Sequence, residues 1–167
     1  MLVKAGRVID DIFTPAADTD PLPNGPIIVS LKRFQAEKAA LLARRTPLGV
    51  KLETGETPEI LAADLRKLAL IVFHIPQPRD GRAFSWVRLL RRRLGFRGEV
   101  RISGHFLLDQ IAFYTRVGAD AFDIAQNISV DSVKEALTEI SNVYQPSVDG
   151  RQTIWDLREG KATLAPS

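Results

Sequence analysis

The chain has 167 residues, of which 45% are hydrophobic and 26% charged, and this composition is typical of a single globular domain. It contains no cysteine, which excludes disulfides, thiolate metal sites, cysteine-ligated iron–sulfur clusters and a cysteine nucleophile. The formal charge is only +3, from 23 basic and 20 acidic residues, so the composition does not indicate a nucleic-acid partner.

The first 26 residues are predicted to form an N-terminal arm. Leu2 to Ile9 is compatible with a hairpin that turns at Gly6. The prolines that follow disfavour regular structure; they are Pro15, Pro21, Pro23 and Pro26.

After the arm, strands and helices are expected to alternate. A strand over residues 27–30 leads into a helix over 31–45 and a second strand over 47–52. The sequence Thr57-Pro58-Glu59 combines a cap, a first-turn proline and an acid, which predicts a helix from there to about Lys67. The remaining strands and helices are expected at residues 69–75, 83–94, 99–103, 106–117, 121–124 and 129–142.

Strict alternation of this kind requires right-handed crossovers and an α/β fold with a mostly parallel sheet of four or five strands. We expect an open doubly wound sheet; the alternative is a half-barrel-like βα repeat, because a complete barrel needs about 250 residues. The α/β domain is placed at residues 27–144 and a C-terminal tail at 145–167. In the tail, Ile154, Trp155 and Leu157 indicate docking on another surface.

No apolar run approaches the roughly 20 residues that span a bilayer, and residues 1–11 lack an apolar signal core. A cytoplasmic protein without a membrane partner is therefore expected. The sequence has no dinucleotide fingerprint and no phosphate loop, so the cofactor stays unassigned. Its two histidines, His74 and His105, predict no metal site.

The loops that leave the C-terminal ends of parallel strands share one edge of the sheet. These loops are expected at residues 77–82, 103–105 and 126–129. They form our candidate site for a small anion, since they would bring helix N-termini together with Arg79, Asp80, Arg82 and His105. In the alternative interpretation, Asp80 belongs to a turn, the arginines are solvated and His105 only precedes a helix.

Two polar side chains point inward on predicted helices. Arg91 falls within an apolar arc and must either reach the edge of the protein or meet a carboxylate. Gln110 also falls within an apolar arc; it is a candidate for ligand binding, but we favour a structural hydrogen bond to a loop backbone. Arg88 and Arg92 form a solvated stripe rather than a nucleic-acid interface.

The run DGRAFSWVRLLRRRLGFRGEVRISGHFLLDQ, residues 80–110, and GADAFDI, residues 118–124, resemble a bacterial family of uncharacterised proteins often encoded beside assimilatory sulfite reductase. LPNGPIIVSL (22–31) and LGVKLETGE (48–56) are also similar to the family pattern, so the resemblance covers most of the chain. The matching positions are Asp80, Gly81, Arg82, Ser85, Arg88, Leu89, Gly95, Gly98, Glu99, Arg101, Gly104, Asp109, Gln110, Gly118 and Phe122.

Members of that family are labelled as oxidoreductases of sulfite reduction because of their gene neighbourhood, and the resemblance brings no established catalytic residues. It implies an accessory protein of assimilatory sulfite reduction whose partner is the reductase or its electron donor.

The alternative is an α/β enzyme or binding protein for a small anionic or phosphorylated ligand at the C-terminal edge of the sheet. Asp80 or His105 would then be the acid or base, and Arg82 the anion clamp. A third interpretation is a structural partner anchored by Trp155. Whether the chain is an enzyme and whether it forms a homo-oligomer stay open.

Overall fold

The computed structural model describes residues 1–125, 128–138 and 146–159. Within these ranges one sheet of eight strands has the order β2-β1-β8-β7-β6-β5-β4-β3. Its five central parallel strands are those predicted from the sequence: β4 (Ile27–Ser30), β5 (Leu48–Leu52), β6 (Leu70–Ile75), β7 (Glu99–Gly104) and β8 (Ala121–Asp123). The α/β class and the mostly parallel sheet are therefore confirmed.

The strand number is eight rather than four or five, because the arm contributes three short strands to the edges of the sheet. β1 (Leu2–Lys4) and β2 (Arg7–Val8) form the predicted hairpin, and β1 also pairs antiparallel with β8. β3 (Thr14–Pro15) pairs with β4 at the opposite edge, where a proline is tolerated. Strands of two or three residues are too short to show periodicity in a sequence.

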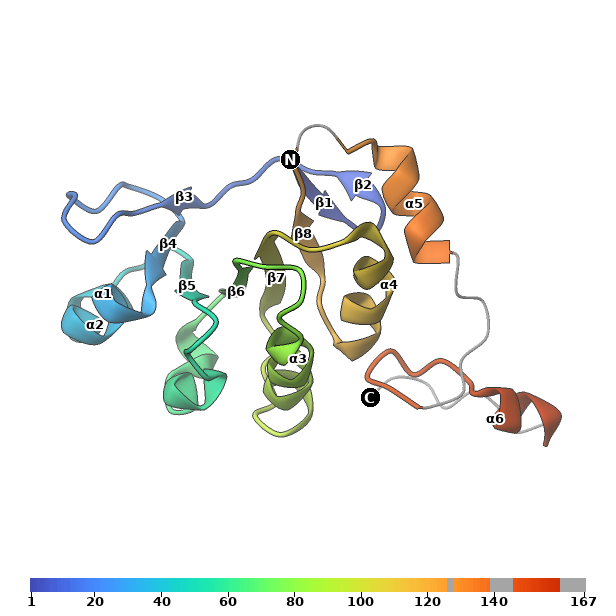
Figure 1. The fold of residues 1–167 in the computed structure, drawn as a ribbon. Coiled ribbons are helices and arrows are strands. Elements are labelled where there is room, and N and C mark those ends of the chain that lie inside the picture. Colours follow the sequence, from blue (N-terminus) through green and yellow to red (C-terminus); the bar gives the residue numbers. More distant parts are fainter. Residues whose placement is uncertain (126–127, 139–145, 160–167) are drawn as a thin grey trace.

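The expected doubly wound arrangement is wrong, and the half-barrel alternative is correct. A doubly wound sheet needs a reversal of strand order, but β4 to β8 follow one another without a break. Successive right-handed crossovers then place every helix on the same face. Figure 1 shows this arrangement for α1 (Leu31–Ala36), α2 (Lys38–Leu42), α3 (Arg82–Arg92) and α4 (Leu108–Val117).

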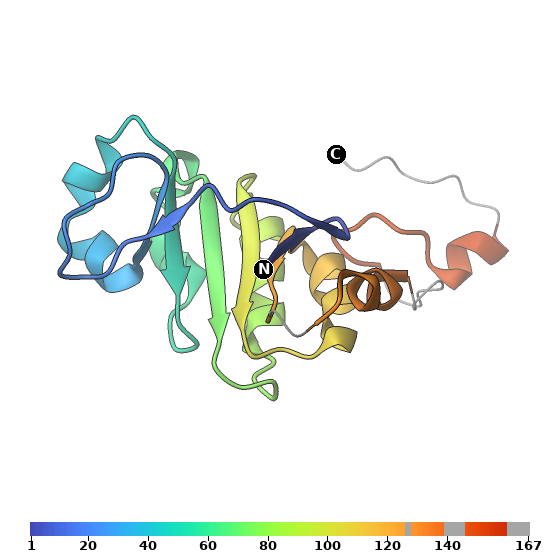
Figure 2. The same ribbon diagram turned by 90° about the horizontal axis from the view of Figure 1, so that it is seen from above.

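The N-terminal connection requires the sheet to curl. β2 and β3 lie at opposite edges, seven strand spacings apart, which is about 34 Å along the sheet. Residues 9–13 join these strands and reach at most about 21 Å when fully extended. The two edges of the sheet must therefore approach each other. Residues 9–13, which we call the strap, cross the face of the sheet opposite the helices, which we call the open face (Figure 2).

Two predicted helices are broken. The helix expected over 57–67 begins at Pro58 as predicted, but it forms two 3-10 turns, η1 (Pro58–Leu61) and η2 (Leu65–Lys67). Between them lies buried Asp64, a poor interior helix residue, which pairs with Lys38 at 2.6 Å. The helix expected over 31–45 is interrupted at Glu37, between α1 and α2.

The last helices are α5 (Val130–Thr138) and α6 (Ile154–Arg158). Ser129 caps α5 as predicted, accepting the Ser132 backbone N–H at 3.1 Å, whereas its expected end at Asn142 and the loop at 126–127 lie outside the described residues. No helix in the described ranges is long and apolar enough to cross a membrane.

Trp155 is 57% exposed and Leu157 is 54% exposed, so the apolar side chains of the tail do not anchor it within the described structure, and their docking on another surface stays a prediction. Polar contacts hold the tail instead. The Ser147 hydroxyl donates to the Arg116 carbonyl at 2.7 Å, and Arg116 pairs with Asp149 at 3.2 Å.

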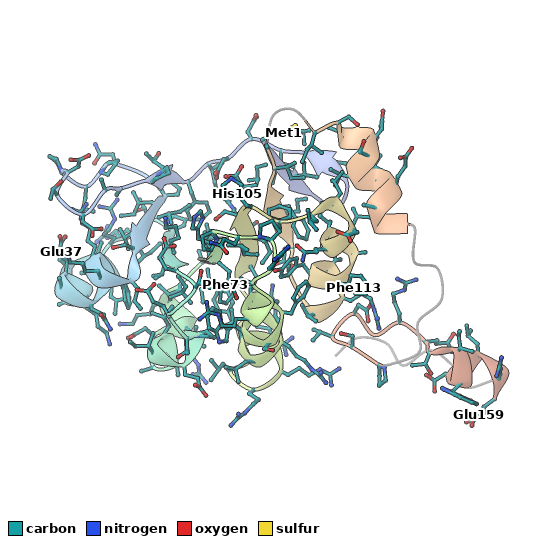
Figure 3. The ribbon with its side chains drawn as sticks, in the orientation of Figure 1. Met1, Glu37, Phe73, His105, Phe113 and Glu159 are labelled. Atoms are coloured by element: carbon teal, nitrogen blue, oxygen red, sulfur yellow. The ribbon has the colours of Figure 1, made fainter. Side chains whose placement is uncertain are left out.

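The core lies between the sheet and the helices. Alternate strand residues such as Val50, Phe73 and Ile102 are buried against Val87 and Leu90 of α3. Phe73 also stacks on the ring of Trp86, 6.3 Å away, and lies between the sheet and α3 in Figure 3. The intervening strand residues face the opposite side, which these helices do not cover.

Candidate functional site

Polar side chains occupy the open face of the three central strands. Strand residues alternate between faces, so the burial of Val50, Phe73 and Ile102 directs their sequence neighbours to the other side. Those neighbours are Lys51 in β5, His74 in β6, and Arg101 and Ser103 in β7. In β7 polar residues alternate with buried apolar ones, which is typical of a strand with one uncovered face, whereas a strand covered on both faces reads as a continuous apolar run.

The strand register aligns these residues in two neighbouring rows. Lys51 pairs with Val72, which pairs with Arg101, while His74 pairs with Ser103. Together they border a pocket of about 290 Å³ on the open face. The pocket is lined by Asp11, Pro15, Ile28, Lys51, Val72, His74, Arg101, Ser103, Gly104 and Asp123.

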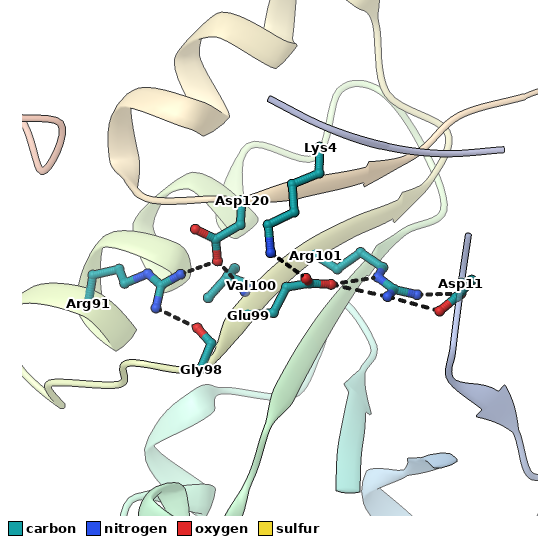
Figure 4. A network of polar contacts seen from close by, with 8 residues as sticks. All are labelled: Lys4, Asp11, Arg91, Gly98, Glu99, Val100, Arg101 and Asp120. Carbon is teal, nitrogen blue, oxygen red and sulfur yellow. Dashed lines mark hydrogen bonds and ion pairs between the residues drawn. The ribbon is translucent and has the colours of Figure 1, made fainter. Parts of the chain in front are cut away.

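Arg101 is the most deeply placed charge in this pocket, with a side chain only 5% exposed. Its guanidinium donates to the two carboxylate oxygens of Asp11 at 2.6 and 3.1 Å and to Glu99 at 3.1 Å (Figure 4). Glu99 in turn pairs with Lys4 at 2.8 Å, and the ring of Phe13 lies 5.8 Å from the guanidinium carbon. The strap is therefore pinned to the sheet at Arg101.

His74 and Ser103 form the second polar pair. The His74 Nδ1 atom lies 3.3 Å from the Ser103 hydroxyl oxygen, and both residues are partly exposed. Lys51 pairs with Glu53 at 2.8 Å, and both of these side chains are at least 40% exposed. An exposed pair of this kind contributes little to stability, so the Lys51 ammonium is able to turn toward a ligand. Ammonium, imidazole, hydroxyl and guanidinium groups all donate hydrogen bonds, which suits an anion with several oxygens.

In the predicted strand-end site, Asp80 and Arg82 pair with each other, while Arg79 and His105 are exposed. Arg82 donates from Nε and Nη2 to Asp80 at 2.9 and 2.7 Å, and these hydrogen bonds hold the pKa of the Asp80 carboxyl below its ordinary value. The Arg82 side chain is 59% exposed and lies over Trp86. Arg79 and His105, the latter labelled in Figure 3, are exposed.

Gln110 makes the backbone hydrogen bonds favoured from the sequence. Its Nε2 donates to the Pro78 carbonyl at 3.1 Å, and its Oε1 accepts the Leu107 N–H at 3.0 Å. The side chain therefore links the two loops that follow β6 and β7. Beneath this edge, Tyr114 is fully buried and stacks on Phe84 with ring centroids 3.8 Å apart, and its hydroxyl has no partner in the described residues.

Lys51 and Arg101 are not among the site residues expected from the sequence, Ser103 is included only as the start of the loop 103–105, and His74 is considered only as a metal ligand. Their signal was the alternation of polar and apolar residues along β7, together with one polar residue near the end of β5 and of β6. A doubly wound sheet would have helices on both faces, and that expectation left no place for an open polar face. Gly104 lines the same pocket and belongs to the matching positions named above, together with Glu99 and Arg101.

The fold and the open face define a class: an α/β half-barrel protein with a polar pocket on its uncovered side. Comparison with curated proteins gave no match to the sequence. A sequence model of the family described as "Bacterial protein of unknown function (DUF934)" matches residues 49–155, more than half of the chain. The chain belongs to this family, and the resemblance to an uncharacterised bacterial family is confirmed.

Proposed function

We propose that this protein binds a small oxyanion on the open face of its half-barrel and acts as a cytoplasmic accessory protein of assimilatory sulfite reduction. One observation carries the binding proposal: Lys51, His74, Arg101 and Ser103, from three adjacent strands, border one pocket. The link to sulfite reduction is supported by the family resemblance, since members are often encoded beside the reductase.

The chemistry of the pocket favours an oxyanion over a neutral metabolite. Sulfite, sulfate and phosphate accept several hydrogen bonds at once, and the pocket offers donors of four chemical types. The space of about 290 Å³ holds such an anion together with ordered water, or a larger phosphorylated ligand. The alternative function has the same ligands, and for it too we propose binding on the open face instead of at the strand ends.

A supporting role is favoured over catalysis of the reduction itself. With no cysteine, the chain has no thiolate with which to hold an iron–sulfur cluster. Electrons for the six-electron reduction of sulfite would therefore come from a partner, either the reductase or its electron donor. The protein would bind the oxyanion and contact that partner.

Ligand binding is tested by calorimetric titration of the full chain with sulfite under anaerobic conditions, and with sulfate and phosphate. We expect saturable binding that Lys51→Gln and Ser103→Ala each weaken about five- to ten-fold, because each removes one donor. Arg82→Gln is the control at the strand ends and should leave the affinity unchanged. Loss of binding in Arg82→Gln alone would move the site to the strand ends, and no binding of any anion would reject the binding proposal.

The accessory role is tested separately in cells. Tagged protein from sulfate-grown cells should retain sulfite reductase or its electron donor, and a deletion strain should grow poorly on sulfate but normally on cysteine. Normal growth of the deletion strain on sulfate, together with recovery of no sulfur-assimilation enzyme, would contradict this role.

A further inference from the structure

The pocket of the open face already contains an anion, and that anion belongs to the protein itself. The Asp11 carboxylate approaches Arg101 through both oxygens, at 2.6 and 3.1 Å. This two-point geometry is the one by which a guanidinium binds a free carboxylate or an oxyanion of sulfur or phosphorus. Asp11 therefore occupies the position at Arg101 that such a ligand would take.

The two carboxylates on Arg101 differ in how firmly they are held. The Glu99 side chain is 17% exposed, lies on β7 itself, and is also paired with Lys4. The Asp11 side chain is 37% exposed and lies on the strap. Glu99 is therefore a fixed partner that orients the guanidinium. The Asp11 carboxylate, whose Oδ1 also accepts the Phe13 backbone N–H at 3.0 Å, can move away with the strap and leave two donors for another anion.

Apart from the contacts of Asp11 and Phe13 with Arg101, the strap has few attachments to the sheet in the described structure. Its flanks are fixed, because Ile9 donates to the Leu2 carbonyl and Thr14 donates to the Pro26 carbonyl, both at 3.0 Å. Between them, the backbone amides of residues 10–13 make no hydrogen bond to the sheet in the described part of the chain. Ile12 is 66% exposed, so little apolar contact opposes a local rearrangement.

We propose that Arg101 is the anion receptor of the open face and that Asp11 is its built-in competitor, which a bound oxyanion or carboxylate displaces. This inference rests on the proposed binding function and adds the receptor and its regulation to it. The apparent affinity for an anion is the intrinsic affinity reduced by the fraction of protein in which Asp11 has left Arg101. If that fraction is about one in ten, removal of the competitor tightens binding about ten-fold.

The test compares two neighbouring aspartates. Asp11→Asn keeps the size of the side chain and removes its charge, and we expect it to bind sulfite or phosphate about ten-fold more tightly than the wild type. Asp10→Asn is the matched control, because Asp10 is exposed and forms no ion pair with Arg101 in the described structure, yet its substitution changes the net charge equally. Its affinity should equal that of the wild type.

A second variant tests the receptor. Arg101→Lys keeps the charge but loses the two-point geometry, so it should weaken binding in the wild type and abolish the gain in Asp11→Asn. Thermal unfolding of each variant verifies that it is folded. If the wild type binds anions and Asp11→Asn binds them no better, the competitor proposal is overturned while the binding function stands. If neither protein binds, both proposals fail.

Discussion

The Arg91 guanidinium lies 2.5 Å from the Asp120 carboxylate, and the same carboxylate oxygen accepts the Val100 backbone N–H at 2.8 Å (Figure 4). Arg91 also donates to the carbonyls of Gly98 and Gly118, at 2.8 and 2.9 Å. The inward arginine predicted from the sequence has thus met a carboxylate. It ties α3 to the start of β7 and to the turn before β8.

Replacement of Arg91 should destabilise the protein more than a typical substitution on a surface helix does. Arg91→Met leaves the Asp120 carboxylate and three backbone carbonyls without this donor, and we expect the free energy of unfolding to fall by about 2–4 kcal/mol. Urea unfolding followed by circular dichroism measures the change. Arg88→Met, at an exposed position of the same helix, should alter stability by less than about 0.5 kcal/mol. Equal effects of the two substitutions would show that Arg91 has no special structural role.

Gly104 should not tolerate a side chain. Its φ is +95°, and an added Cβ would lie 2.2 Å from the Ile75 carbonyl oxygen on the neighbouring strand. Gly104→Ala should therefore lower the free energy of unfolding by at least about 2 kcal/mol and distort the pocket beside Ser103. Gly55→Ala is the control, since nothing lies within 4 Å of its added Cβ and its φ is outside the left-handed region. A Gly104→Ala protein as stable as this control would contradict the close approach seen here.

Gln110 is predicted to stabilise the fold rather than to bind a ligand. Gln110→Ala removes the bridge between Pro78 and Leu107, which should lower the free energy of unfolding by about 1–2 kcal/mol. Anion affinity should stay at the wild-type value, measured by the same titration. Gln77→Ala, an exposed neighbour on the same loop, should change neither quantity. Weaker anion binding in Gln110→Ala with unchanged stability would restore the ligand-contact interpretation.

The central part of the fold was predictable because its signals are local. β4 and β6 are apolar runs and β7 alternates apolar with polar residues, while Gly118 and Ser129 mark a helix end and a helix start. The winding of the sheet was not predictable in this way. Strand order depends on contacts between distant residues, and the same alternation of strands and helices is compatible with a doubly wound sheet and with a half-barrel.

The open-face site was missed for the same reason. Whether Lys51 and Arg101 share a face depends on the pairing of β5, β6 and β7, and Asp11 reaches Arg101 only because the strap joins opposite edges of the sheet. By contrast, Asp80 and Arg82 are close in sequence, and the turn that joins them is one of the two interpretations that the sequence allows for this loop. Local pairs are visible in a sequence, whereas pockets between strands are not.

Tyr114 provides a prediction that combines stability with pH. Burial, followed by the negative charge of Asp80, raises the pKa of the Tyr114 hydroxyl above its ordinary value of about 10. The unfolded chain releases this proton near pH 10 and the folded chain does not, so the folded state is penalised as the pH rises above about 10.

Tyr114→Phe removes this penalty and also a buried hydroxyl without a described partner, so it should raise the free energy of unfolding by about 1 kcal/mol at pH 8. In urea unfolding, its advantage over the wild type should widen at about pH 11. Phe113→Tyr, which adds a phenol at an exposed position of α4, should show no such pH dependence, and an advantage of Tyr114→Phe that stays constant with pH would refute the raised pKa.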